Sequence, residues 1–282
     1  MKADAQLLLQ QAQWAGQHAL PLFFMTLALL LAATGACWWI LQRYDLDRGQ
    51  RIMSSRVAIG LRVAIGTAII LLSTGVFAEL AGHLGVGGNL SRADQALTDA
   101  LQTSVPQSML QVFAILTHFG DTVTLTGLCL GILIALIVVD RRCLALGWVV
   151  AVAGNGLLNQ TLKQIYGRIR PLHPDDLMLA QGFSFPSGHS SGTVVAYGML
   201  AYLVLRLLPA RWHLPTLVAM VVLAFTVGTS RLFLRVHFAS DVIAGFASGA
   251  AWLALCIMSM ELLRLRSQYQ IEYAINVNRS QQ

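Results

Sequence analysis

The chain has 282 residues, of which 56% are hydrophobic and only 11% are charged, and its formal net charge is +6. Soluble globular domains carry about 25% charged residues, so this composition excludes an ordinary soluble domain and indicates a membrane protein. The positive charge does not indicate nucleic-acid binding, because the arginines are scattered in short loops between apolar runs instead of forming one basic face.

Apolar segments of the length of a membrane span recur along the whole chain. A helix that crosses the hydrocarbon core needs about 20 mostly apolar residues. The chain is therefore predicted to be all-α, a polytopic bundle of membrane helices. Residues 1–19 contain one basic residue, Lys2, and no small-residue cleavage site, and we do not interpret them as a cleaved signal peptide. The seven predicted spans are residues 20–41, 60–83, 121–139, 143–162, 190–208, 214–232 and 240–263.

A short amphipathic helix is predicted between the second and third spans. Ser91 and Asp94 have the spacing of a capping box, which opens a helix by satisfying its first free N–H groups. Leu97 and Leu101 fall on one face of this helix, and Pro106 ends it. We expect the helix to lie on the membrane surface; a loop is the alternative.

Glycines recur four residues apart in three of the predicted helices, a spacing that lets two helix backbones approach closely. We expect these positions to be helix-packing contacts. The pairs are Gly127 with Gly131, Gly188 with Gly192, and Gly245 with Gly249.

The distribution of arginines predicts the orientation, because cytoplasmic loops of membrane proteins are enriched in Lys and Arg. If the spans alternate, one side carries most of the loop arginines. The other side carries Lys2, Arg92 and three polar segments, which we therefore expect to face the periplasm or its equivalent. The arginines expected on the cytoplasmic side are Arg43, Arg48, Arg51, Arg56, Arg141, Arg142, Arg206, Arg211, Arg264 and Arg266.

The three polar segments are residues 163–171 (KQIYGRIRP), 186–189 (PSGH) and 230–241 (SRLFLRVHFASD). The second comes directly before a predicted span, so its backbone N–H groups are expected at a helix N-terminus, which binds anions well. Gly188 would let a phosphate approach the backbone, and Ser187 has a hydroxyl to donate. His189, as an imidazolium, is a candidate acid for a departing alkoxide.

The third segment carries a candidate nucleophile. His237 and Asp241 are four residues apart and share one face of a helix. An Asp that accepts from one imidazole nitrogen fixes the tautomer and leaves the other nitrogen free to attack. Arg231 precedes this pair and is suited to hold phosphate oxygens by its fork of donors. Lys163 and Arg170, from the first segment, are expected to reach the same pocket.

These residues together predict phosphoryl transfer. In-line displacement would place the phosphoryl group on His237, and a water that His189 deprotonates would then hydrolyse the phosphohistidine. The cations would stabilise the charge on the equatorial oxygens. No carboxylate cluster or His/Cys set in the sequence has the pattern of a metal site, so neither a metal nor another cofactor is expected.

In this order and between apolar spans, K-x6-RP, PSGH and SR-x5-H-x3-D resemble the three signature motifs of the type 2 phosphatidic acid phosphatase superfamily, which includes integral-membrane lipid phosphatases. The resemblance covers roughly residues 120–260 and fills every signature position. It implies a six-span core, to which residues 20–41 add an N-terminal span. The implied phosphate ligands are Lys163, Arg170, Ser187, Gly188 and Arg231, with His189 as the acid, His237 as the nucleophile and Asp241 as its orienter.

Two further arginines, Arg168 and Arg235, lie beside the motifs without a signature role. We expect each to contact lipid headgroups or solvent; a contact with a second phosphate of the substrate is the alternative. The expected organisation is an N-terminal segment with the added span and a basic cytoplasmic loop (1–56), a membrane phosphatase domain (57–265) and a polar C-terminal tail (266–282).

The expected function is a metal-independent lipid phosphatase of the bacterial-type inner membrane that acts on the outer face. Its expected partner is a membrane lipid phosphate and not a nucleic acid. Undecaprenyl diphosphate is the first expectation, with phosphatidylglycerol phosphate, phosphatidate and lipid A phosphate as alternatives. A phosphotransferase, in which an acceptor other than water takes the phosphoryl group, is a further variant.

Two rival functions belong to other classes. Residues 188–192 match GxSxG, which suggests a serine hydrolase built on Ser190, but that motif requires a strand before the serine. An anion transporter would use the cations as a path, but such proteins place their charges near the midplane of broken helices. The predicted clustering of charges at one face favours the phosphatase.

Overall fold

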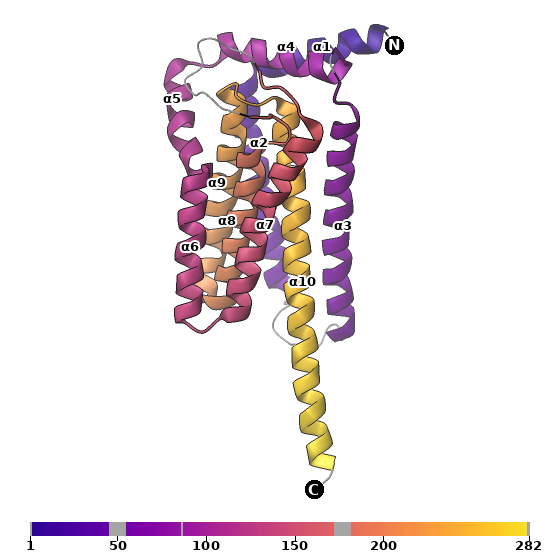
Figure 1. The fold of residues 1–282 in the computed structure, drawn as a ribbon, viewed down its shortest axis with the longest axis vertical. Coiled ribbons are helices and arrows are strands. Elements are labelled where there is room, and N and C mark those ends of the chain that lie inside the picture. The colour runs from indigo at the N-terminus through magenta and orange to yellow at the C-terminus, as the bar shows by residue number, and fades with distance from the viewer. Residues whose placement is uncertain (1, 45–54, 86, 172–181, 281–282) are drawn as a thin grey trace.

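A computed structural model describes residues 2–44, 55–85, 87–171 and 182–280 as helices joined by short connections (Figure 1). These described ranges contain no strand. Within them, six helices are long and apolar enough to cross a membrane. They are α2 (Ala19–Tyr44), α3 (Ser55–Gly82), α7 (Arg142–Tyr166), α8 (Gly188–Leu207), α9 (His213–Phe233) and α10 (Ala239–Ser280).

Two further pieces together have the length and composition of a seventh crossing. Helix α5 (Gln107–Leu116) continues into the 3-10 turn η1 (Thr117–Gly120), and α6 (Thr122–Val138) follows at an angle of 41°. Asp121, between them, has an extended backbone that interrupts the helix. All seven predicted spans lie on helices, and the predicted fold class, an all-α membrane bundle, is confirmed.

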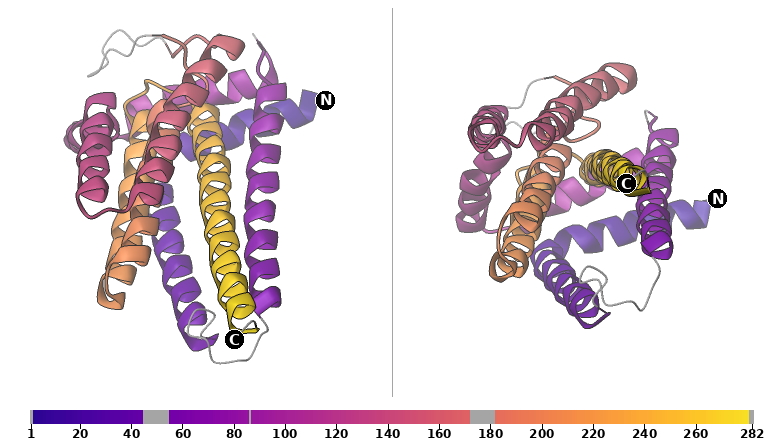
Figure 2. Two further views of the ribbon diagram at one scale, coloured as in Figure 1. Left: turned by 60° about the horizontal axis from the view of Figure 1, so that its bottom comes forward. Right: turned by 90° about the horizontal axis from the view of Figure 1, so that it is seen from below.

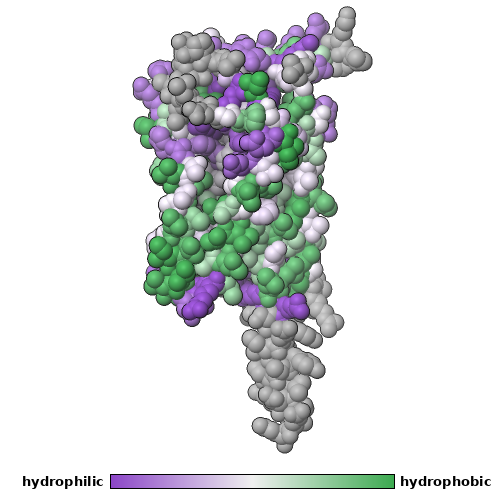
Figure 3. Space-filling model, viewed as in Figure 1, coloured by the Kyte–Doolittle hydropathy of each residue, from purple (hydrophilic) through white to green (hydrophobic). Residues whose placement is uncertain are grey.

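The outer surface of the bundle is apolar, as a lipid-facing surface requires. Hydrophobic residues form a broad band around the helices, and hydrophilic residues gather mainly toward the end where α4 lies (Figure 3). On α3, Leu71 and Leu72 expose 67% and 72% of their surface. Side chains of this kind would be costly in water, so the band marks the part of the bundle that lies in the hydrocarbon core.

Two packed clusters hold the helices together. One surrounds the fully buried Trp148 of α7, and it includes Val195 and Met199 of α8. The other joins α2 to α9: Phe23 stacks on Phe225 with 5.3 Å between ring centroids, and it also contacts Phe233 edge-on. The added N-terminal span is therefore packed against the helix that ends in the third polar segment.

Helices α1 (Lys2–Gln17) and α4 (Asn89–Ser104) lie across one end of the bundle as a surface layer (Figures 1 and 2). They are in close contact, because a Cβ added to Gly16 would lie 2.6 Å from Cβ of Ala100. We refer to these two helices as the end layer. The predicted helix of residues 91–105 is thus confirmed, with Leu101 buried, and it ends before Pro106.

The prediction that Ser91 and Asp94 form a capping box at the start of α4 is wrong. The helix begins two residues before Ser91, after Gly88, and no side chain caps it. Ser91 Oγ donates instead to the carbonyl of Gly85, at 2.8 Å. The carboxylate of Asp94 turns into the bundle, where it meets a buried arginine. A strong buried partner has displaced the local capping bond.

The glycine pairs have unequal roles. A Cβ on Gly245 would lie 2.6 Å from the carbonyl oxygen of Ser187, and one on Gly249 would lie 2.8 Å from that of Ser191. These contacts press α10 against the first turn of α8, so the packing prediction is confirmed there. Gly127 and Gly131, on α6, have no atom of another element within 4 Å of an added Cβ, and the packing prediction is wrong for them.

Candidate active site

The first polar segment is turned toward the site by the end of α7. Gly167 has φ of +55°, in the left-handed region that glycine adopts without steric cost, and its N–H bonds to the carbonyl of Lys163 at 3.0 Å. The chain then leaves the helix, so Arg168 and Arg170 project from the segment that follows. Arg170 donates to the carbonyl of Val236 at 2.8 Å, which ties the first segment to the third.

The second polar segment forms the N-terminus of α8. Ser187 is its N-cap: Ser187 Oγ accepts from the backbone N–H of Ser190 at 3.4 Å and from the Ser190 hydroxyl at 2.9 Å. The N–H of Ser187 bonds to the carbonyl of Asp241 at 2.9 Å. Gly188 and His189 are therefore held in the first turn of α8, where the backbone N–H groups of a helix lack intrahelical partners.

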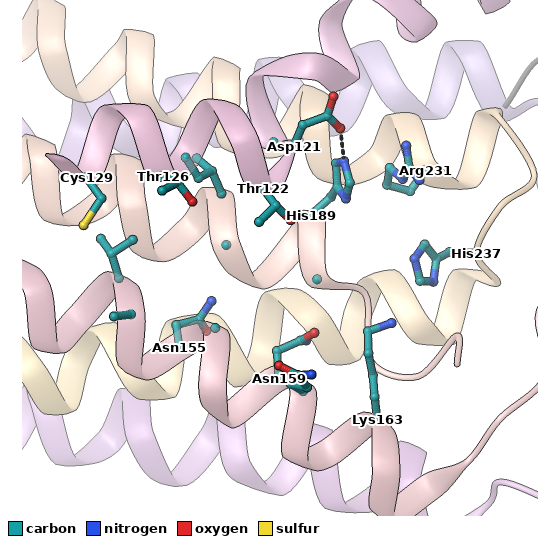
Figure 4. A pocket seen from close by; sticks show the side chains of 18 of the residues that line it. Asp121, Thr122, Thr126, Cys129, Asn155, Asn159, Lys163, His189, Arg231 and His237 are labelled. Atoms are coloured by element: carbon teal, nitrogen blue, oxygen red, sulfur yellow. Dashed lines mark hydrogen bonds and ion pairs between the residues drawn. The ribbon is translucent and has the colours of Figure 1, made fainter. Parts of the chain in front are cut away.

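The three segments meet at one cavity of about 680 Å³ (Figure 4). Figure 4 shows Lys163, Arg231 and His237 around the same space, with His189 on α8 beside them. Ser187 and Asp241 are fully buried and do not line the cavity. The predicted site residues that line it are Lys163, Arg170, Gly188, His189, Arg231 and His237.

His237 is buried and held at both ring nitrogens. Nδ1 faces Asp241 Oδ2 at 3.4 Å, and Nε2 accepts a hydrogen bond from Arg170 Nη1 at 3.0 Å. Because arginine only donates, the lone pair is on Nε2 and the proton is on Nδ1. Burial lowers the pKa of His237 to about 3, and the opposing effect of Asp241 is smaller. The imidazole is thus neutral at neutral pH, with its lone pair directed to the cavity side.

His189 has a carboxylate partner that motif reasoning did not supply. Its Nε2 donates to Asp121 Oδ1 at 2.8 Å, and the other oxygen of Asp121 accepts from His118 Nδ1 at 2.7 Å. Neither His118 nor Asp121 belongs to the three polar segments. The signal was weak, because Asp121 is 68 positions from His189 and is recognisable only as a carboxylate at the edge of an apolar segment.

Asp241 is surrounded by donors. Its carboxylate accepts from Arg168 Nη1 at 2.7 Å, from the N–H of Phe238 at 2.9 Å, and from the Ser184 hydroxyl. The expectation that Arg168 contacts headgroups or solvent is wrong, since its side chain is only 11% exposed and is paired with two carboxylates. Arg235 is also buried, in the turn between α9 and α10, and is not among the cavity-lining residues.

Below the cations the cavity continues between α6 and α7 with a partly polar wall. Asn155 and Asn159 lie on the α7 side, where Asn159 Nδ2 donates to Ser191 Oγ at 3.3 Å. Asn155 Oδ1 is buried and has no hydrogen-bond partner. The α6 side carries Thr122 and Thr126. Within the described ranges, no three His, Cys, Asp or Glu side chains are placed to hold a metal ion.

Comparison with known proteins assigns this arrangement to a family. A family model described as PAP2 superfamily matches residues 144–264. Phosphatidylglycerophosphatase B of Bacillus subtilis is 31% identical over 159 residues, which are 56% of this chain and 78% of that protein. The chain belongs to the PAP2 superfamily.

Two further proteins are similar to this chain. Lipid A 1-phosphatase of Rhizobium etli is 33% identical over 175 residues, covering 53% of this chain and 70% of the relative. The crystal structure of a transmembrane PAP2 type phosphatidylglycerolphosphate phosphatase from Bacillus subtilis matches with a TM-score of 0.61 at 27% identity. The match covers 96% of that chain but 70% of this one, so this PAP2 lipid phosphatase has elements beyond the shared bundle.

Proposed function

We propose that this PAP2 protein removes a phosphate group from the headgroup of a membrane lipid by way of a phosphohistidine at His237, without a metal. The observation that carries the proposal is the convergence at one cavity of a neutral, buried imidazole, a second histidine and three cations. These groups come from three separate segments of the chain. A site of this kind supplies a nucleophile, an acid and charge stabilisation for phosphoryl transfer.

In the first step the phosphate enters between Lys163, Arg231 and the N-terminus of α8. Arg170 transfers its hydrogen bond from His237 Nε2 to a phosphate oxygen, which frees the lone pair. Nε2 then forms a bond to phosphorus as the bond from phosphorus to the lipid oxygen breaks. His189 donates its proton to the departing alkoxide, and Asp241 stabilises the charge that develops on His237.

In the second step a water attacks the phosphohistidine. His189, now neutral, takes a proton from that water, the bond from phosphorus to Nε2 breaks, and inorganic phosphate leaves. His189 is protonated again and His237 is again neutral, so the cycle closes without another reagent. Three fixed cations around the phosphoryl group carry the charge that builds on its oxygens in both steps.

We propose that the cavity faces outward from the bacterial inner membrane. In Figure 1 the α6–α7 and α8–α9 connections, which carry Arg141 and Arg211, lie at the end opposite the end layer. Arg48 and Arg51 lie outside the described residues. An excess of arginine on one side favours that side as cytoplasmic. We likewise propose the division into an N-terminal segment, a phosphatase domain and a C-terminal tail, with the tail continuing α10.

For the substrate, we propose a lipid phosphomonoester whose alcohol part carries hydrogen-bonding groups, with phosphatidylglycerol phosphate first and a lipid A phosphate second. The names of the relatives favour these two over undecaprenyl diphosphate, the first expectation from the sequence. The polar wall of the cavity, with the unpartnered oxygen of Asn155, also suits a glycerol or sugar better than the hydrocarbon that follows a prenyl diphosphate.

The test is phosphate release by the purified protein from these three lipids in detergent micelles with EDTA present. We expect release from at least one lipid in wild type, and none above background in His237→Ala. Activity that EDTA abolishes, or an active His237→Ala, would refute the mechanism. A preference for undecaprenyl diphosphate that Asn155→Leu leaves unchanged would refute the substrate assignment alone. Adding glycerol as acceptor distinguishes transfer from hydrolysis.

A further inference from the structure

The carboxylate of Asp241 is held by a residue at a variable position of the first motif, K-x6-RP. Arg168 places its guanidinium between two acidic side chains. Nη1 donates to Asp241 Oδ1 at 2.7 Å and to Ser240 Oγ at 2.6 Å, and Nη2 donates to Asp94 Oδ2 at 2.8 Å. The guanidinium also lies 4.4 Å from the ring centroid of Phe238. A planar fork with fixed donors makes all these contacts at once, which a lysine would not do.

Asp94 completes the network from the end layer. Its Oδ1 accepts from the backbone N–H of Ser240 at 3.1 Å, and its Oδ2 accepts from the Ser240 hydroxyl. Ser240 is the second residue of α10, so Asp94 satisfies one of the free N–H groups at the N-terminus of that helix. Asp94 is 4% exposed, and it precedes Ser240 by 146 positions.

These contacts fix the start of α10 in position and direction. Asp241 is the third residue of α10, and His237 lies just before the helix. A shift of α10 would move both partners of the Asp241–His237 hydrogen bond relative to the cavity. A buried arginine held by two carboxylates resists such a shift, because separating it from either one leaves a charge unpaired in a buried site.

We propose that Arg168 and Asp94 are positioning residues for the reaction: they hold the Asp241 carboxylate against His237 and set how much of its charge acts on that imidazole. The end layer therefore contributes to the active site, because its helix α4 supplies Asp94. The inference rests on the proposed role of His237 as the nucleophile. Neither Arg168 nor Asp94 lines the cavity, so neither is proposed to touch the substrate.

Removing Arg168 and removing Asp94 should shift the pKa of His237 in opposite directions. Removing the cation of Arg168 leaves the Asp241 carboxylate uncompensated, which stabilises protonated His237. Removing the anion of Asp94 leaves Arg168 to act on Asp241 alone, which disfavours protonated His237. The other charged groups of the site are unchanged in both cases. They are Lys163 on α7, Arg170 after it, Arg231 on α9, Asp241 itself on α10, and the pair of Asp121, before α6, and His189, on α8.

The experiment measures kcat and KM from pH 7 down to pH 3 for wild type, Arg168→Gln and Asp94→Asn, so that the range reaches the pKa of His237 of about 3. We expect kcat of Arg168→Gln to fall at least about tenfold, with its acid limb moved upward by about 1 pH unit. The acid limb of Asp94→Asn should not move upward. KM should stay within about threefold in both, because the phosphate ligands are intact. The substrate's own ionisation is common to all variants and cancels.

Matched controls come from the same helix. Arg92→Gln and Asp99→Asn remove one charge of each sign from exposed positions of α4, and should leave both kcat and the pH profile unchanged. Arg168→Lys keeps the charge but loses the fork, so we expect a wild-type acid limb with a reduced kcat. Thermal unfolding of each variant in detergent identifies any that do not fold, and Asp94→Asn and Arg168→Lys keep the test open if Arg168→Gln is one of them.

Two results would overturn the inference. One is an Arg168→Gln variant with a raised KM, weaker inhibition by inorganic phosphate and an unchanged acid limb, which would make Arg168 a phosphate ligand. The other is wild-type kcat and pH dependence in both variants. Activity in His237→Ala would instead refute the proposed function, so failures of the two proposals are distinguishable.

Discussion

Asp121→Asn removes the charge of the carboxylate that contacts His189 and keeps its size. In the mechanism proposed above, His189 is protonated when the lipid oxygen departs, and the 2.8 Å hydrogen bond to Asp121 stabilises that form. A hydrogen bond to a charged group contributes about 1.5–3 kcal/mol. At about 1.4 kcal/mol for each factor of ten, its loss corresponds to a reduction of roughly 10- to 150-fold in kcat/KM.

A comparison of two substrates shows whether the loss in kcat/KM comes from protonation of the leaving group. A lipid alkoxide needs a proton as it departs, whereas p-nitrophenolate leaves as an anion without one. We therefore expect the full loss in kcat/KM with the lipid substrate and a loss within about threefold with p-nitrophenyl phosphate, since kcat/KM reports only the steps through transfer to His237. Phosphate release from the two substrates by one preparation of each variant measures both values.

A matched control is the exposed pair of Glu79 and His83, in which Oε1 of Glu79 lies 3.5 Å from Nδ1 of His83. Neither residue lines the cavity. Glu79→Gln should leave both substrates unaffected. His118→Gln, which removes the outer partner of Asp121, should have a smaller effect than Asp121→Asn. Equal losses on both substrates in Asp121→Asn would refute a role in leaving-group protonation, and an unchanged kcat/KM would refute the role of the contact altogether.

Three further predictions concern the rival serine, the helix contact and the nucleophile. Ser190→Ala should retain activity within about tenfold, because the Ser190 hydroxyl bonds to Ser187 Oγ and to the carbonyl of Gly228. Losing these bonds should lower the free energy of unfolding by about 1 kcal/mol. Full inactivation of a folded variant would support the serine hydrolase. Gly245→Val should lower the free energy of unfolding by about 3 kcal/mol or more and reduce activity, because the valine side chain would overlap the backbone of the first turn of α8. Gly127→Val should be tolerated, because an added Cβ there has no neighbour within 4 Å. Thermal unfolding in detergent compares the two variants. Because the pKa of His237 is lowered to about 3, its imidazole stays neutral as the pH falls from 7 to 5. After correction for substrate ionisation, kcat/KM should therefore stay constant over this range. A loss of kcat/KM centred near pH 6.5, the ordinary pKa of histidine, would contradict this prediction.

Much of the fold could be predicted because a membrane imposes its own length and composition on each helix. The span predicted at 121–139 is observed as α6 from Thr122 to Val138, and its start is set by the extended backbone of Asp121. The polar segments were recognisable because charged residues are rare against an apolar background. Their meeting at one cavity follows from the ends of α7 and α9 and the starts of α8 and α10 lying at one end of the bundle.

The positions of the supporting residues could not be predicted, because they depend on contacts between distant segments. Asp94 has the local spacing of a cap, but a buried arginine 74 positions away binds its carboxylate more strongly than a helix N–H would. The same contact makes Arg168 a buried residue, although its sequence neighbours resemble a solvated loop. Helix α1 was missed because its apolar residues are too few for a span, and it is stabilised by packing on α4.

The central claim is that the phosphoryl group passes through a covalent bond to His237. Its most direct test is a rapid acid-free quench of the enzyme during turnover of a lipid labelled in its terminal phosphate, followed by mapping of the label. We expect a labelled chain whose phosphate is stable to alkali, labile to acid and located on the peptide with His237, and no label in His237→Ala. A label on another residue, or turnover at full rate in His237→Ala, would contradict it.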